Sequence, residues 1–128
     1  MPKPIAHTSG ICFAMPDILN TPSPSGTVPL PYPNTAQLAD AQGAATSVNA
    51  GGKAVILKSS SIPGSSGGEP ATAQPFNGAT AACEFTSASG SVFANGSEIV
   101  RMGDSTDQNN GNCQGQVMAG LTTVLVGD

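Results

Sequence analysis

Apolar and polar positions repeat in the second half of the chain. The segment Val48–Leu57 aligns with Val92–Arg101 at a constant offset of 44 residues, so that Val55, for example, matches Ile99. In each copy a short strand runs into a Gly-Gly or Asn-Gly pair, the strongest short signal for a β-hairpin, and a second strand follows. The repeat therefore predicts two similar hairpins arranged around one axis.

Further strands are predicted outside these two copies. Thr122–Val126 is rich in β-branched residues and resembles the opening of a third copy that the end of the sequence cuts short. Ala82–Thr86 predicts a strand that turns through Ser87–Gly90 into a second strand at Ser91–Phe93. The second half of the chain is thus expected to be a small antiparallel β-assembly.

The first third of the chain is rich in proline, most densely over Thr21–Asn34. Proline lacks an amide donor and has a fixed φ, so this segment predicts an extended, polyproline-like strap that lies over the domain and is not a ladder strand. A solvated linker is the alternative. Interleaved Val28, Leu30 and Tyr32 favour the docked strap.

Between the strap and the first hairpin, Thr35–Ala45 predicts one or two helical turns with Asn34 or Thr35 as the N-cap. Polar stretches follow each repeat copy, at residues 59–68 and 103–116, and predict long loops. Loops of this length in a small domain need something to hold them in place.

The composition fits one thinly packed domain. The chain has 128 residues, no tryptophan, 16 glycines and 11 prolines. Since a domain typically contains about 100–150 residues, we expect a single domain over residues 1–128. So much glycine and proline excludes a helix-rich fold and favours irregular β-structure.

Charge excludes several classes of function. The chain carries only four basic and eight acidic residues, so it lacks the clustered Lys and Arg that bind nucleic acid and the basic amphipathic face of a membrane-surface helix. No stretch approaches the about 20 apolar residues of a transmembrane helix, and the start has no apolar run suited to a secretory signal. We expect synthesis in the cytoplasm and, if the protein leaves the cell, a machine that carries it.

Four soft ligands suggest a metal site. The three cysteines, Cys12, Cys83 and Cys113, cannot all pair within the chain, and a reducing cytoplasm disfavours disulfides. Together with the only histidine, His7, they supply the four ligands of a closed tetrahedral zinc site, with iron as the less favoured occupant. The alternative is that Cys12 and Cys83 are small buried hydrophobes.

Catalysis is not expected. His7 with one cysteine is the only nucleophile and base pair available for thiol chemistry, and a histidine this close to the N-terminus would be poorly held. No glycine-rich phosphate motif opens a helix. We therefore assign no catalytic residue and no cofactor-binding residue other than the metal ligands.

Five stretches resemble the PAAR-like domain family, in particular the toxin PAAR-like branch associated with type VI secretion and related contractile systems. The proline segment with its Pro-Tyr-Pro-Asn core is the most specific of them. They occur in order over nearly the full chain: Ile11–Asp17, Val28–Asn34, Gly64–Pro70, Ala82–Ser89 and Glu98–Thr106.

The resemblance implies a small cone of short antiparallel β-hairpins with long irregular loops, in which residues 1–45 form the Pro-rich strap with a possible short helix and residues 46–128 form the cone. Its base would sit on the trimeric β-helix of a valine-glycine repeat spike protein, one copy per spike trimer, and its apex would contact the target membrane transiently. Similar proteins carry one zinc ion near the apex, bound by histidine and cysteine side chains. Its implied place is the tip of the injection apparatus, with which it is expelled, and effectors are further possible partners.

One departure concerns the metal site. Relatives commonly place a His-Asn pair after the Asp-x-Thr segment, whereas this chain reads Asp104-Ser-Thr-Asp-Gln-Asn-Asn110, and its nearest soft ligand there is Cys113. Two alternatives to the spike tip remain open. One is a small effector, adaptor or toxin-associated domain on the same scaffold, and the other is the cap of a phage-like or extracellular injection particle.

Overall fold

The computed structural model describes residues 2–65, 82–109 and 111–127 of the chain. Within these ranges the backbone forms short antiparallel strands and a single 3-10 turn, η1 (Leu38–Asp40), which confirms the mainly β fold. The strands are β1 (Lys3–Ile5), β2 (Ile11–Ser23), β3 (Gly26–Gln37), β4 (Asn49–Ala50), β5 (Lys53–Ala54), β6 (Ser61–Ile62), β7 (Cys83–Phe85), β8 (Phe93–Ala94), β9 (Ser97–Glu98), β10 (Ser105–Gln108), β11 (Cys113–Val117) and β12 (Leu121–Val126).

The two repeat copies fold as predicted. β4 pairs with β5 and β8 pairs with β9, each antiparallel and each joined by a two-residue turn. Both residues of each turn have positive φ, at 59° and 80° for Gly51 and Gly52 and at 49° and 82° for Asn95 and Gly96. Positive φ at both central residues defines the type I′ turn, whose twist matches that of the flanking strands.

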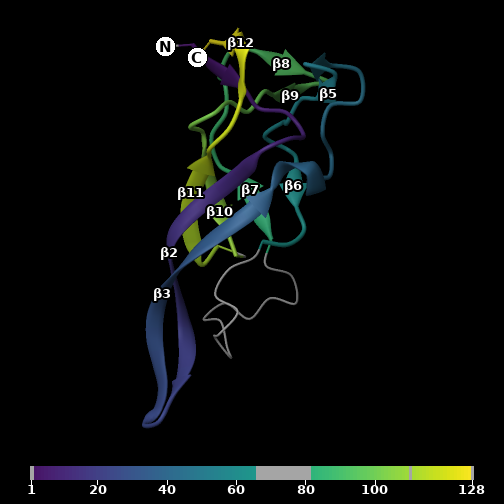
Figure 1. Cartoon of the computed structure of the whole chain (residues 1–128). Helices are drawn as coiled ribbons and strands as arrows, with labels where there is room; N and C mark the ends of the chain where they lie inside the picture. Colours follow the sequence, from purple (N-terminus) through teal and green to yellow (C-terminus); the bar gives the residue numbers. More distant parts are fainter. Residues whose placement is uncertain (1, 66–81, 110, 128) are drawn as a thin grey trace.

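A third antiparallel strand pair completes the set; the two ends of the chain form it without a connecting turn, and it is counted below as the third hairpin. β12 pairs antiparallel with β1, with Lys3 opposite Val126 and Pro4 opposite Leu125. Figure 1 shows both termini beside this pair, at the same end of the molecule as β8, β9 and β5. The partner of the predicted strand at residues 122–126 is therefore the N-terminal strand, which lies too far away in sequence for a local hairpin signal.

A closed ring of backbone hydrogen bonds joins the three hairpins. The amide of Ala6 donates to the carbonyl of Val100 at 3.0 Å, the amide of Val100 to Ile56 at 2.9 Å, and the amide of Ile56 back to Ala6 at 3.0 Å. Outside the ring, three equivalent hydrogen bonds extend the same strand pairs, with the amides of Thr8, Lys58 and Met102 donating to the carbonyls of Ala54, Glu98 and Pro4, respectively. The hairpins are thus related by a pseudo-three-fold axis.

Each of the three strands in this ring contributes side chains to two cores. Ala6, Ile56 and Val100 are fully buried on one side of the ring, where they pack with the six-stranded sheet. Their neighbours Ile5 and Val55, like Ile99, point to the other side and fill the space between the hairpins. At the next matched positions this second core contains Ala50, Ala94 and Val126.

The six-stranded antiparallel sheet has the order β3-β2-β11-β10-β7-β6 and lies below the three hairpins in Figure 1. Residues 103–116, which the sequence predicted as a loop, form most of the β10–β11 hairpin of this sheet. Polar residues occupy the inward positions of β10, where Thr106 and Gln108 are fully buried. Because those positions are not apolar, the period-2 signal of a strand was hidden.

The proline-rich segment is extended but forms a ladder, contrary to the prediction. β3 pairs with β2 from Gln37 opposite Ile11 to Gly26 opposite Ser23. β3 is an edge strand of the sheet, and its three prolines stand at alternate positions, so their missing amides can all face outward at no cost to the pairing. The strands continue beyond the sheet as a projecting hairpin (Figure 1).

Two local predictions were wrong. The helical segment is reduced to the turn η1, and its N-cap is Gln37 without a side-chain hydrogen bond, because Thr35 belongs to β3. The segment 91–93 does not pair with β7, which lies between β6 and β10. The hydroxyl of Ser89 accepts the amides of Ser91 and Val92 and thereby ties this segment to a turn. In the predicted loop 59–68, Ser61 and Ile62 instead form β6, and the rest of the segment ends outside the described residues.

Candidate functional site

The three cysteines lie inside the curved six-stranded sheet. Cys12 is on β2, Cys83 on β7 and Cys113 on β11, and all three are buried free thiols. Alternation along each strand explains this placement, because in β7 the residues Cys83 and Phe85 are buried while Glu84 between them is exposed.

The structure brings two of these thiols together. The pKa of Cys83 is raised above its ordinary value. A hydrogen bond with Cys12 is the largest cause, and burial raises the pKa further. Both residues are fully buried and belong to the core beneath the hairpin ring, together with Phe85. They therefore fill core volume as small apolar residues while presenting two adjacent sulfur atoms.

Cys113 has different partners. Its thiol donates to the carbonyl of Gln108 across the β10–β11 pair, with 3.6 Å between the sulfur and the oxygen. Burial, followed by the negative charge of Asp17, raises the pKa of Cys113 to about 12. This thiol is consequently held in its neutral form at physiological pH.

His7 belongs to the hairpin ring. It is bridged to Val55 and to Ser9, and its position along the ring strand matches those of Leu57 and Arg101. Its Nδ1 atom is buried and has no hydrogen-bond partner in the described structure. A buried imidazole nitrogen without a partner is a donor atom of the kind that zinc uses.

The fit of these residues to a zinc ion is therefore partial. Among residues 2–65, 82–109 and 111–127, no group of three or more His, Cys, Asp or Glu side chains is gathered closely enough to hold a metal ion. The adjacent Cys12 and Cys83 thiols and the unpartnered His7 Nδ1 supply suitable donor chemistry. Joint ligation by His7, Cys12, Cys83 and Cys113 stays a prediction.

A buried polar cluster, which the sequence analysis missed, surrounds Asp17. The Asp17 carboxylate is fully buried and accepts the side-chain amides of Asn34 at 3.3 Å and Asn109 at 2.8 Å. The side-chain amide of Asn112 donates to the same carboxylate and, at 3.1 Å, to the carbonyl of Ile18. Hydrogen bonds of this charge-assisted kind stabilise the ionised form of a buried carboxylate.

Gln108 extends this cluster into β3 and along β10. Its side-chain amide donates to both the carbonyl and the Oδ1 atom of Asn34, and its own oxygen accepts the Thr106 hydroxyl at 2.8 Å. The cluster therefore joins the β10–β11 turn to the point where β2 and β3 leave the sheet. Its sequence signal was the asparagine-rich run 109–112, which the search for soft metal ligands passed over.

A second buried charge holds the third hairpin. Arg101 donates from Nε to Asp104 Oδ2 at 3.0 Å and from an Nη atom to Oδ1 at 2.9 Å, a two-point ion pair that is almost fully buried. Another Nη atom donates at 3.2 Å to the carbonyl of Gly127, immediately after β12. Arg101 thus clamps the C-terminal strand to the hairpin ring.

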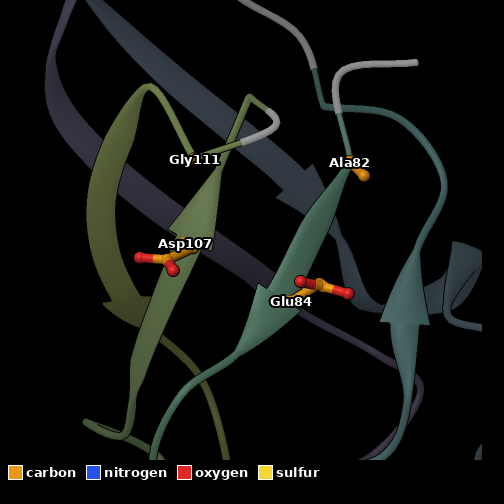
Figure 2. A pocket seen from close by; sticks show the side chains of 4 residues that line it. All are labelled: Ala82, Glu84, Asp107 and Gly111. Carbon is orange, nitrogen blue, oxygen red and sulfur yellow. The ribbon is translucent and has the colours of Figure 1, made fainter. Parts of the chain in front are cut away.

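The outer surface carries a shallow hollow of about 300 Å³ lined by Ala82, Glu84, Asp107 and Gly111. Figure 2 shows Glu84 and Asp107 on neighbouring strands, with the Asp107 carboxylate pointing away from Glu84. The two residues are directly opposite in the β7–β10 register, where like charges repel. Nothing in this arrangement positions a base against a nucleophile.

Large apolar side chains are exposed on the hairpin ring. Phe93 and Leu125 are 56% and 59% exposed, and they face Glu98 and Pro4 in their respective hairpins. The register makes them equivalent about the pseudo-three-fold axis, and exposed Asn49 occupies the third equivalent position. We call Asn49, Phe93 and Leu125 the ring face.

In comparisons with known proteins, a family model described as Toxin PAAR-like domain matches residues 10–115. No curated protein sequence and no solved structure matched the chain. None of the helical structure in the described residues is long and apolar enough to span a bilayer.

Proposed function

Because the chain belongs to the toxin PAAR-like domain family, we propose that it caps the trimeric spike of a contractile injection system and sharpens it for membrane puncture. Family membership supports the coarser part of this statement, a spike-associated or toxin-related role in type VI secretion. Capping of the spike is the finer part. In this proposal the chain is made in the bacterial cytoplasm, assembled at the spike tip and expelled with it, and it carries out no catalytic step.

The observation that carries the proposal is the closed hydrogen-bond ring of Ala6, Ile56 and Val100. A trimeric spike ends in three identical strand sets related by a three-fold axis, and a single chain can match that symmetry only if it offers three similar surfaces. The three hairpins provide them. Their equivalence is in the backbone, so it does not depend on identical side chains.

The ring face provides apolar contact area for such a partner. Phe93 and Leu125 together expose large side chains at two of the three equivalent positions, and the β2–β3 projection points to the opposite end of the molecule (Figure 1). Aromatic and aliphatic anchors of this kind dominate the energetics of protein interfaces. With the ring face on the spike, the projection points forward.

Zinc remains part of the proposal. The tapering molecule has two small cores, and a metal ion would add stability that little apolar burial can supply. The adjacent thiols of Cys12 and Cys83 support the idea, with His7 and Cys113 as the remaining proposed ligands. A bound zinc ion would play a structural role by cross-linking strands that are distant in the sequence.

Capping is tested by binding of the purified chain to its cognate trimeric spike. Phe93→Asp and Leu125→Asp place a charge in the proposed contact and are expected to weaken binding by about tenfold or more each. Met118→Asp is the matched control, since Met118 is also an exposed apolar residue, at 51%, but lies outside the ring face. Unchanged binding of both ring-face variants would count against this docking surface.

A further inference from the structure

The β2–β3 hairpin projects from the sheet as an arm. We define the arm as residues 15–33, which lie beyond the part of β2 that pairs with β11 at Cys12, Phe13 and Ala14. From Asp17 opposite Tyr32 to Ser23 opposite Gly26 the arm contains seven consecutive residue pairs. At about 3.3 Å per residue this is roughly 20 Å of hairpin, or about two-thirds of the hydrocarbon thickness of a bilayer.

The surface of the arm is apolar and uncharged. Residues 18–39 contain no Asp, Glu, Lys, Arg or His, and the one charged residue of the arm, Asp17, is buried in the polar cluster at its base. Among the arm residues whose exposure the structure describes, Ser25 is the only exposed one with a polar side chain, and Asn20, Ser23 and Tyr32 are half-buried. The exposed positions are Met15, Pro16, Ile18, Pro24, Ser25, Gly26, Val28, Pro29, Leu30, Pro31 and Pro33.

Proline removes the backbone donors that an edge strand would leave unpaired. Pro29 and Pro31 lie opposite Asn20 and Ile18, and since proline cannot donate to the partner strand, these are the positions whose amides would point outward. Pro33 is the next residue of β3 whose amide position would point outward, since every second residue does so. An unpaired amide costs little in water but several kcal/mol in hydrocarbon. Over residues 29–33 the outer edge of β3 therefore presents no unpaired backbone amide.

Three of the remaining polar side chains of the arm have hydrogen-bond partners within it. The hydroxyls of Thr21 and Tyr32 share a hydrogen bond of 2.6 Å across the two strands. At the turn, the Ser23 hydroxyl donates to the carbonyl of Gly26 at 2.6 Å. These groups therefore do not require water as a partner, which lowers the cost of removing the arm from water.

We propose that the β2–β3 arm is the element that enters the membrane, and that it inserts spontaneously into the hydrocarbon region of a lipid bilayer. This inference rests on the proposed function, because it assigns the forward contact of the spike tip to one hairpin. The polar cluster around Asp17 holds the base of the arm to the β10–β11 turn. The arm therefore enters as a rigid extension of the sheet.

The chain contains its own probe for this insertion. Tyr32 is the only tyrosine, and there is no tryptophan, so intrinsic emission reports on the arm alone. The full chain is mixed with phosphatidylcholine vesicles whose acyl chains carry bromine, a contact quencher, and with vesicles of the same lipid without bromine. We expect strong quenching of Tyr32 only in the brominated vesicles.

Variants connect this signal to the arm surface. Ile18→Asp, at a position 39% exposed, is expected to weaken vesicle binding by about 100-fold, since a carboxylate at the membrane centre is strongly disfavoured. Leu30→Asp is the second arm variant, and Ile18→Val is expected to retain binding. Phe93→Asp places the same charge on the ring face and is expected to bind vesicles normally while binding the spike more weakly.

Pro31→Ala distinguishes a membrane from a protein as the partner of the arm. The substitution keeps the side chain apolar and returns one outward amide, which is expected to weaken vesicle binding by about 30-fold or more without lowering the melting temperature. A protein that added a strand to this edge would instead bind the alanine variant more tightly. The vesicle assay contains no spike, so insertion and capping can fail independently.

Three results would overturn the membrane assignment. The first is equal Tyr32 emission with the two kinds of vesicle. The second is binding that is unaffected by Ile18→Asp and Leu30→Asp in variants that melt like the natural chain. The third is a change of Tyr32 emission with protein concentration in the absence of lipid, because this would show that the arm pairs with a second copy.

Discussion

Asp17 is the residue on which the polar interior depends most. Its carboxylate is fully buried and accepts side-chain amides from Asn34, Asn109 and Asn112. Within the described residues these amides replace the water that a carboxylate would otherwise bind. Removing the charge leaves several buried donors competing for one oxygen.

We predict that Asp17→Asn lowers the free energy of unfolding by about 1–3 kcal/mol, the usual cost of leaving buried donors without an acceptor. Asp107→Asn is the matched control. Asp107 lies on the outer face opposite Glu84, so removing its charge relieves repulsion and should leave stability equal or slightly higher. Denaturant unfolding measures both variants, and equal losses would contradict the role given to the cluster.

The thiol of Cys113 predicts an alkaline limit of stability in the metal-free protein. Its pKa rises from the ordinary 9.0 to about 12 on folding, so the folded chain holds this proton more tightly than the unfolded chain. Stability is therefore unaffected by this group below about pH 9 and falls as the pH rises toward about 12. Unfolding measured in chelator across this range should show the fall, and Cys113→Ala should make it shallower.

Among the elements, β2 and β11 approach each other closely at Gly115. A side chain at Gly115 would place its Cβ atom 2.1 Å from the carbonyl oxygen of Phe13, which no local adjustment of a side chain can relieve. The strand pair therefore requires glycine at this position. The requirement is steric, because Gly115 does not have a positive φ.

We predict that Gly115→Ala destabilises the fold by at least about 3 kcal/mol, at or beyond the upper end of ordinary overpacking, because β2 and β11 must separate. Gly90→Ala is the control, since Gly90 has a negative φ and no atom within 4 Å of the added methyl group. Thermal melting of the two variants gives the comparison. A Gly115→Ala chain as stable as the control would show that the β2–β11 pairing is wrong.

Elements with a strong local signal were predictable from sequence, and elements with a distant partner were not. Gly51-Gly52 and Asn95-Gly96 specify type I′ turns by themselves, so both hairpins were found. The β1–β12 pair joins residues 3–5 to residues 121–126, and no local pattern records that closure. The prediction that β3 is not a ladder strand was wrong because it rested on the amide that each proline lacks. At alternate positions of an edge strand, all of these missing amides can face outward.

The site was predicted less completely for a related reason. Counting soft ligands identified Cys12 and Cys83, which the fold does place side by side. The same count could not show that the Cys113 thiol donates to Gln108 or that asparagines around Asp17 form the buried cluster. Amide side chains carry no spacing rule comparable to that of a zinc motif, so their convergence becomes visible only in three dimensions.

At the scale of the whole molecule, the proposed zinc ion makes a prediction about stability. Protein purified without a metal-affinity step should contain about one zinc ion per chain, and chelation should lower its melting temperature by at least about 10 °C, because structural zinc contributes a large binding free energy. Cys12→Ser and Cys83→Ser should abolish the metal content. If the purified protein contains no zinc and chelator leaves its melting temperature unchanged, a structural zinc ion is excluded.

The two proposed contact regions lie at opposite ends of the molecule. The hairpin ring is built from three similar strands at one end, and the uncharged arm extends from the other (Figure 1). We propose that the first end meets the trimeric spike and that the second meets lipid. The six-stranded sheet and the Asp17 cluster lie between them.

The proposed capping of the spike is tested most directly by the native mass of the complex between this chain and its cognate trimeric spike. A ring of three backbone-equivalent hairpins within one chain predicts a single copy of the chain per spike trimer, with Phe93→Asp reducing the amount of complex formed. Three copies per trimer, one on each spike subunit, would contradict the account, because the pseudo-three-fold ring would then have no three-fold partner to match.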